Sequence, residues 1–128
     1  MKRGSEHIRL GRRGERVAAR YLERKGFEIL GSGMRLRSAE IDLLARDGSS
    51  FVLVEVKTLR YREGEEQRPG RHYTEDQRRR QRRAVWELRR EFGDVDFPFR
   101  QDLVEVIMGR YFPCEIRHHT DYYKYHHL

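Results

Sequence analysis

The sequence predicts an α/β fold in which helices flank a mixed β-sheet, with the element order α-β-β-β-α-β-β. Three observations indicate this class. Residues 11–25 and 74–92 carry apolar side chains at helical spacing, residues 40–57 form two apolar runs around a turn signal, and residues 102–108 form a further apolar run. At 128 residues, the chain is expected to fold as a single domain.

The first helix is predicted from Gly11 to Lys25, and Gly26 is a typical residue at which a helix ends. Its apolar stripe consists of Val17, Ala18, Tyr21 and Leu22. Residues 1–10 are polar, and we expect them to form a flexible arm. Residues 27–30 predict a short first strand, which the glycines at 31 and 33 interrupt.

A β-hairpin is predicted next, with Asp47 and Gly48 as its two-residue turn, because this dipeptide suits a turn that needs positive φ at both central residues. The resulting register pairs Leu44 with Phe51, Asp42 with Leu53, and Glu40 with Glu55. Residues that face each other across two strands share one face of the sheet. This places four charged side chains on one face, at the end away from the turn: Glu40, Asp42, Glu55 and Lys57.

Charged groups on such an apolar hairpin are costly to bury without a purpose. Three carboxylates and a lysine at the end of such a hairpin favour a hard cation held by oxygen ligands, Mg²⁺ or Mn²⁺, over zinc. The alternative is an exposed edge strand on which Glu55 and Lys57 form a solvated pair. The continuous apolar run at residues 51–54 argues against that alternative, because it is typical of a strand covered on both faces.

Glu15 lies on the apolar side of the first predicted helix. It is either a first-turn glutamate that complements the helix dipole or a further carboxylate of the metal site. The second helix is expected to begin with Thr74 as its N-cap and Gln77 in a capping box, and Gln77 could also reach the site.

The remaining elements follow from short apolar runs. Strands are predicted at 94–97 and 102–108, with a possible last strand at 114–117. The predicted domain therefore covers residues 11–117, and residues 118–128 form a C-terminal tail.

A net charge of +7 indicates a polyanionic partner, with nucleic acid ahead of an anionic membrane surface. The alternative is a soluble protein from an arginine-rich proteome. Phosphate contacts are expected from arginines of the polar loop and of the second helix, namely Arg60, Arg62, Arg78, Arg79 and Arg82. A single cysteine fits a reducing, cytoplasmic location, and no segment suits a membrane span.

Asp42 and the Glu55-Val56-Lys57 triplet resemble the D…(D/E)-x-K signature of the restriction-endonuclease-like nuclease superfamily. A longer pattern resembles the YraN-like family of bacterial proteins, which are similar in fold to archaeal-type Holliday-junction resolvases. Its segments are Gly14-Glu15, Tyr21-Leu22, Gly26-Phe27, Glu40-Ile41-Asp42-Leu43, Val54-Glu55-Val56-Lys57-Thr58 and Arg100-x-Asp102-Leu103-Val104.

This resemblance implies a nuclease fold with Asp42 and Glu55 as metal ligands and Lys57 as the catalytic lysine. Glu15 matches the helix glutamate of the resolvases, the Val56 carbonyl is a further possible ligand, and Glu40 and Gln77 would support the site from outside. We expect a DNA endonuclease that uses Mg²⁺ or Mn²⁺ and selects its substrate by structure. Resolvase-like action would need two active sites and therefore a homodimer. The alternative is a nucleic-acid-binding module or scaffold that keeps the fold without cleaving.

Overall fold

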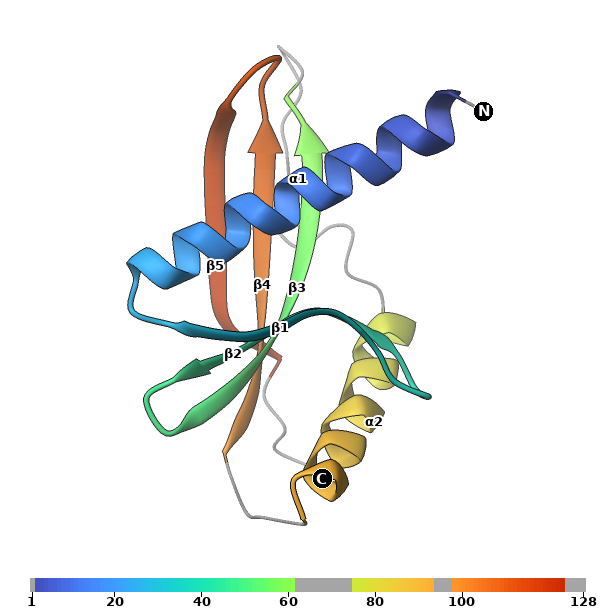
Figure 1. The fold of residues 1–128 in the computed structure, drawn as a ribbon, viewed down its shortest axis with the longest axis vertical. Coiled ribbons are helices and arrows are strands. Elements are labelled where there is room, and N and C mark those ends of the chain that lie inside the picture. The colour runs from blue at the N-terminus through green and yellow to red at the C-terminus, as the bar shows by residue number, and fades with distance from the viewer. Residues whose placement is uncertain (1, 62–74, 94–97, 124–128) are drawn as a thin grey trace.

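The computed structural model describes residues 2–61, 75–93 and 98–123 (Figure 1). Its elements, in chain order, are α1 (Lys2–Arg24), β1 (Glu28–Arg35), β2 (Glu40–Asp47), β3 (Ser50–Arg60), α2 (Glu75–Glu91), β4 (Phe99–Met108) and β5 (Pro113–Tyr123). The predicted α/β class and the order α-β-β-β-α-β-β are therefore confirmed.

The strands form one five-stranded sheet in the order β1-β2-β3-β4-β5. Neighbouring strands are antiparallel except β3 and β4, which run parallel and are connected through α2. Parallel neighbours need such a crossover connection, because the chain must return to the same end of the sheet. Residues 101–108 of β4 are all buried, as expected for a strand with a neighbour on each side and cover on both faces.

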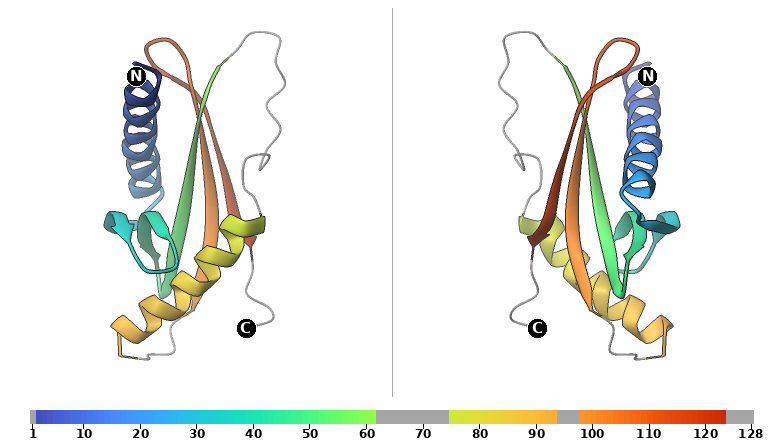
Figure 2. Two further views of the ribbon diagram at one scale, coloured as in Figure 1. Left: turned by 90° about the vertical axis from the view of Figure 1, so that its right-hand side faces the viewer. Right: turned by 90° about the vertical axis from the view of Figure 1, so that its left-hand side faces the viewer.

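The two helices cover opposite faces of the sheet, so that each face has its own apolar cluster (Figure 2). On one face, Ala18 and Leu22 of α1 pack in a cluster with residues of β2, β3 and β4, including Val54 and Val104. On the other face, Ala84, Val85 and Leu88 of α2 pack with Ile41, Leu44 and Leu53. The predicted apolar stripes of both helices thus supply the core.

The β2–β3 hairpin turns one residue later than predicted. Asp47 pairs with Ser50, which leaves Gly48 (φ 62°) and Ser49 as the central residues of the turn. The partner of Leu44 is therefore Leu53 rather than Phe51. A shift by two residues keeps every side chain on its predicted face, because faces alternate with a period of two. Asp42 and Glu55 consequently remain on the same face.

Other boundaries also differ from the sequence-based expectation. α1 begins at Lys2 rather than Gly11, and Leu10 packs against the cluster under α1, so the apolar stripe extends into the expected arm. β1 runs through the glycine segment with a bulge between Ile29 and Gly31. β5 extends to Tyr123, beyond the expected start of the tail. Thr74, Arg62 and the strand predicted at 94–97 lie outside the described residues.

A buried ion-pair network joins the β2–β3 turn to β4 and β5. Asp102 has no exposed side-chain surface, and its carboxylate meets Nε of Arg100 at 3.1 Å and Nε2 of His118 at 2.8 Å. Arg100 also reaches Asp47 Oδ2 at 2.9 Å. Tyr21 and Phe27 hold the His118 ring edge-on. The sequence assigned residue 118 to a tail, whereas the structure makes its side chain part of the interior.

Within the described ranges, no helix is long and apolar enough to cross a membrane.

Candidate active site

Asp42 and Glu55 meet where β2 diverges from β3. The N–H of Val56 donates a hydrogen bond to Oδ2 of Asp42 (2.8 Å), just beyond the last ladder pair, Leu43 with Val54. Lys57 follows on the same face, with its Nζ 3.3 Å from Oε1 of Glu55. The structure thus brings together the three residues of the predicted D…(D/E)-x-K site.

Glu15 reaches the same site from α1. Gly14 lies directly against β3, where a Cβ on this residue would come within 1.8 Å of Thr58 Oγ1, so only glycine permits this approach. The neighbouring residue, Glu15, lies close enough to Asp42 for the charge of that carboxylate to raise the Glu15 pKa. Because α1 begins at Lys2, Glu15 is not in the first turn, and its interpretation as a dipole-complementing glutamate is wrong. The structure instead places Glu15 beside the hairpin carboxylates.

Gln81 of α2 is a site residue that the sequence did not single out. Its Nε2 donates to Oε2 of Glu55 (2.7 Å), and its Oε1 accepts a hydrogen bond from Gln101. Both glutamines are buried. Gln77, which the sequence favoured, lines the adjacent pocket. The signal for Gln81 was its spacing of three and four residues from Ala84 and Val85, which places a polar side chain in a buried helical stripe.

A pocket of about 390 Å³ opens over Asp42 and Glu55 and is lined by residues of the β1–β2 connection and of α2. Its wall carries three arginines, Arg35, Arg37 and Arg80, together with the exposed Glu40. Glu87 of α2 accepts hydrogen bonds from the backbone N–H groups of Arg37 (3.0 Å) and Ser38 (2.8 Å) and from the Ser38 hydroxyl. These bonds lower the pKa of Glu87 and join the two walls of the pocket.

The carboxylates of Glu15, Asp42 and Glu55 are partly or largely buried and repel one another. Binding of protons or of a cation would therefore stabilise them. Burial, and then the charge of Asp42, raise the pKa of Glu55 to about 7. Burial also raises the pKa of Asp42, although the Val56 N–H opposes this shift by stabilising the carboxylate. For Glu15, burial and the charges of Asp42 and Glu40 raise the pKa. A bound divalent cation would relieve this repulsion.

The donor set fits a hard cation with few protein ligands. Among the described residues, no group of three or more His, Cys, Asp or Glu side chains is arranged as a ready-made metal site. Mg²⁺ commonly binds through one or two carboxylates and keeps several water ligands. Asp42 and Glu55 supply that number of carboxylates, and both are oxygen donors as Mg²⁺ and Mn²⁺ require.

The described members of the predicted phosphate-binding arginines come from two elements, β3 and α2. Arg60 is exposed at the end of β3 and lines a hollow of about 450 Å³ with Arg9 and Arg13 of α1. On α2, Arg79 is exposed and Arg82 is half-buried. Arg62 and the side chain of Arg78 are outside the described part of the chain. Of the α2 arginines, it is Arg80, absent from the predicted set, that lines the carboxylate pocket.

The raised pKa of Glu55 predicts that the protein becomes less stable as the pH rises from 4.5 to about 7. The folded protein keeps the Glu55 proton up to about pH 7, whereas the unfolded chain loses it near 4.5, so the free energy of unfolding falls as pH rises between these values. Glu55→Gln removes the buried charge while retaining an acceptor for Gln81. In EDTA at pH 8, we expect this variant to be more stable than the native chain by about 2 kcal/mol, measured by urea unfolding.

At pH 5 the same substitution should change stability little, because Glu55 already carries its proton in the folded protein. The matched control is Glu115→Gln, which changes an exposed glutamate paired with Arg117. If Glu55→Gln were less stable than the native chain at pH 8, the ionised Glu55 carboxylate would not be unfavourable in the folded protein.

Comparison with known sequences identifies relatives of this chain. The profile of the family described as "Uncharacterised protein family UPF0102" matches residues 14–107. A UPF0102 protein from Leifsonia xyli subsp. xyli is 38% identical over 116 residues, which cover 85% of this chain and 91% of the relative. A UPF0102 protein from Symbiobacterium thermophilum is 41% identical over 101 residues, which cover 79% and 84%. A third, from Renibacterium salmoninarum, is 40% identical over 104 residues, with coverage of 79% and 84%.

Proposed function

The chain belongs to the uncharacterised protein family UPF0102, and we propose that it is a metal-dependent endonuclease that hydrolyses phosphodiester bonds in DNA with Mg²⁺ or Mn²⁺. One observation carries the proposal. Asp42 and Glu55 converge at the base of an arginine-lined pocket, with the Lys57 ammonium 3.3 Å from Glu55. The D…(D/E)-x-K resemblance supports the same reaction class.

In this proposal, Asp42 and Glu55 hold the cation, and Glu15 and the Val56 carbonyl are further donors beside it. When bound, the cation supplies positive charge to the phosphate and lowers the pKa of an attacking water. Gln81 orients Glu55 through its 2.7 Å hydrogen bond, and Gln101 orients Gln81. Glu40, at the pocket wall, adds negative field near Glu15.

Lys57 has the role that most directly separates cleavage from binding. Its ammonium is half-buried, and a compact charge there stabilises the additional negative charge that a phosphate acquires in the transition state. Arg35, Arg37 and Arg80 surround the pocket and attract the phosphate backbone before chemistry. In the proposed site, carboxylates at the bottom of the pocket hold the cation and arginines around the pocket hold the substrate.

The direct test is cleavage of labelled duplex, nicked, flapped, branched and single-stranded DNA in Mg²⁺, Mn²⁺ and EDTA. We expect cleavage with either cation and none in EDTA, with Asp42→Asn reducing the rate at least a hundredfold because a ligand charge is lost. Absence of cleavage on all substrates would overturn the enzyme proposal. Equal cleavage by native protein and Asp42→Asn would indicate a contaminating nuclease.

Metal binding should depend on pH, because the cation competes with the Glu55 proton. Below pH 7, each unit of acidification should weaken Mn²⁺ binding by about tenfold, as expected when one proton is displaced. Isothermal titration calorimetry from pH 5 to 8 measures this slope, and proton release can be read from buffers of different ionisation enthalpy. A pH-independent affinity would exclude Glu55 as a ligand.

A non-cleaving nucleic-acid-binding module is the second candidate. The observation that favours it is the lack, within the described ranges, of a preformed group of three metal-binding side chains. Such a protein would retain salt-dependent DNA binding in EDTA and show no cation-dependent cleavage.

A further inference from the structure

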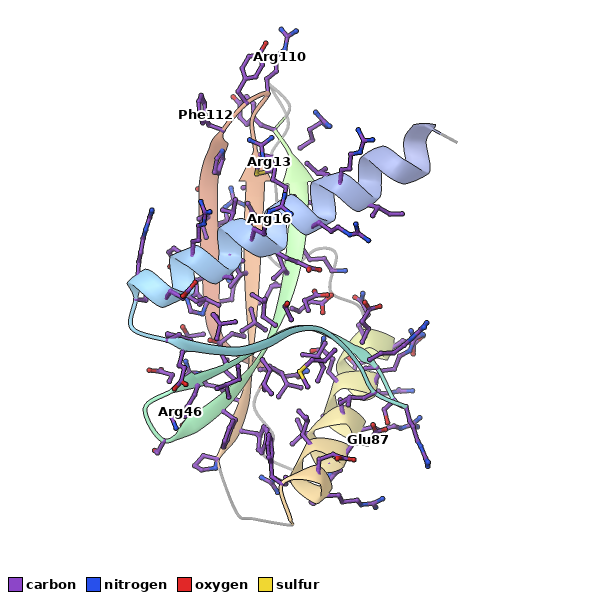
Figure 3. The ribbon with its side chains drawn as sticks, in the orientation of Figure 1. Arg13, Arg16, Arg46, Glu87, Arg110 and Phe112 are labelled. Atoms are coloured by element: carbon purple, nitrogen blue, oxygen red, sulfur yellow. The ribbon has the colours of Figure 1, made fainter. Side chains whose placement is uncertain are left out.

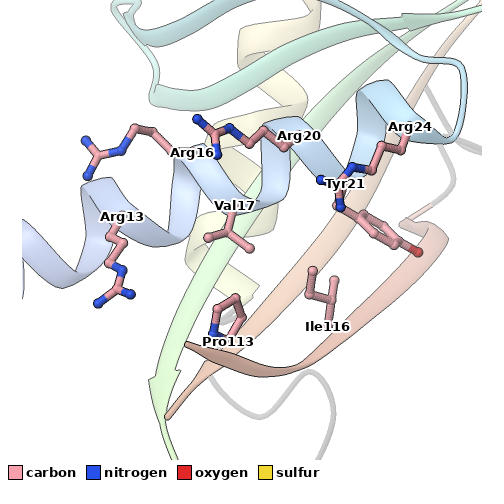
Figure 4. Close-up of a pocket in the computed structure, with 8 residues that line it drawn as sticks. All are labelled: Arg13, Arg16, Val17, Arg20, Tyr21, Arg24, Pro113 and Ile116. Atoms are coloured by element: carbon pink, nitrogen blue, oxygen red, sulfur yellow. The ribbon is translucent and has the colours of Figure 1, made fainter. Parts of the chain in front are cut away.

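A second groove, of about 410 Å³, lies between α1 and the beginning of β5 (Figure 4). We call it the arginine groove. Its rim consists of Arg13, Arg16, Arg20 and Arg24, and its floor of Val17, Tyr21, Pro113 and Ile116. This groove and the carboxylate pocket have no lining residue in common, so the two are separate.

The rim is a continuous stripe of positive charge. Successive spacings of three, four and four residues place the arginines along one side of α1 over about 16 Å. All four residues are exposed, and the groove lining contains no acidic side chain. Like charges four residues apart on a helix repel each other, as Arg16, Arg20 and Arg24 do here. Negative charges of a polyanion bound along the stripe would offset this repulsion.

The arginine groove shares lining residues with two neighbouring hollows, one of which contains Glu15. Arg16 also lines a smaller hollow together with Arg12 and Glu15. At the other side, Arg13 is common to the arginine groove and to the hollow that contains Arg60. Arginine side chains therefore line each of these three hollows, from the one that contains Glu15 to the one that contains Arg60.

Exposed aromatic rings stand at one end of this surface. Tyr111 and Phe112, between β4 and β5, are 64% and 77% exposed. We call these two residues the Tyr111-Phe112 tip. Arg13 of α1 donates a hydrogen bond to the Tyr111 carbonyl, which connects the tip to α1. Figure 3 shows Phe112 and Arg110 at the end of the β4–β5 connection, beyond Arg13. Arg110 lies over the Tyr111 ring, 5.4 Å from its centre.

Aromatic rings of this kind can stack on nucleic-acid bases, but only on bases that are not already paired and stacked in a duplex. We propose that the arginine groove and the Tyr111-Phe112 tip bind an unpaired strand of nucleic acid. The arginines contact its phosphates and the rings contact its bases. This inference rests on the proposed nuclease function and names its substrate class, a nucleic acid with a single-stranded segment at the cleavage point.

Binding is tested in EDTA, where no metal-dependent cleavage occurs, by fluorescence anisotropy with a labelled single strand and a blunt duplex of equal length. The triple variant Arg16→Gln/Arg20→Gln/Arg24→Gln should bind the single strand at least tenfold more weakly. The slope of log affinity against log salt should become shallower by about two, since each lost phosphate contact contributes about 0.7.

The matched control removes three exposed arginines elsewhere, as Arg46→Gln/Arg83→Gln/Arg90→Gln. It has the same net charge, and we expect its affinity to stay within about threefold of the native value. Circular dichroism checks that both variants fold. If the two triple variants lose equal affinity, the effect is one of net charge and the arginine groove is not a binding site.

Phe112→Ser tests the stacking part of the proposal. It should weaken single-strand binding about tenfold and leave duplex binding unchanged. Equal losses on both ligands would overturn the assignment to an unpaired strand, as would displacement of the oligonucleotide by polyglutamate at the same charge concentration. If the native chain binds no nucleic acid, both the proposed function and this inference fail. If it binds nucleic acid and the arginine-groove variants bind equally well, this inference alone fails.

Discussion

Lys57→Ala should reduce metal-dependent cleavage by at least a hundredfold while leaving DNA affinity within about twofold of the native value. The ammonium lies 3.3 Å from Glu55, where charge would develop in the proposed reaction. A group that acts mainly on the transition state lowers the rate when it is removed, whereas substrate binding in the ground state changes little. Single-turnover cleavage and anisotropy in EDTA measure the two quantities separately.

The matched control is Lys25→Ala, which removes an exposed lysine that follows α1 and contacts His118 rather than the carboxylate site. Its cleavage rate should equal that of the native chain. If Lys57→Ala weakens DNA binding and there is no cleavage to lose, Lys57 is an ordinary phosphate contact and the protein is a binding module.

Arg100→Ala should destabilise the protein by about 3 kcal/mol or more. The substitution leaves the fully buried Asp102 carboxylate without its guanidinium partner, and removing one member of a buried ion pair is far more harmful than removing both. It also releases Asp47 at the hairpin turn. The free energy of unfolding from urea titration measures the loss.

Arg46→Ala provides the comparison, because Arg46 pairs with Glu28 at 2.6 Å but both side chains are more than half exposed. That variant should lose less than about 1 kcal/mol. The double variant Arg100→Ala/Asp102→Ala should be less destabilised than the sum of its single variants. Equal losses for Arg100→Ala and Arg46→Ala would mean that the network contributes no more than a surface pair.

The fold was predictable because its signals are local. The apolar stripe with Ala18 and Leu22, the stripe with Ala84 and Leu88, and the alternation along residues 40–57 each define an element from a few neighbouring residues. The turn position was not predictable in the same way. Asp47 suits the turn, but in the structure its carboxylate binds Arg100, 53 residues away. A long-range ion pair accompanies the shifted register, and no local rule includes it.

The candidate site likewise contains residues that local sequence patterns place and residues that depend on long-range packing. Asp42, Glu55 and Lys57 could be placed on one face because strand periodicity survives a two-residue shift. Gln81 and the position of Glu15 depend on how the helices cross the sheet. Glu15 reaches Asp42 because Gly14 allows α1 to lie against Thr58, and a glycine inside a helix does not reveal from sequence which strand it touches.

The two walls of the carboxylate pocket are joined by Glu87, whose carboxylate accepts both backbone N–H groups of Arg37 and Ser38. Glu87 does not line the pocket, and no described hydrogen bond connects it with Asp42 or Glu55. The contact that holds the two pocket walls together and the carboxylates at the bottom of the pocket therefore involve different residues. A substitution at Glu87 would loosen the contact between α2 and the β1–β2 connection without changing Asp42 or Glu55.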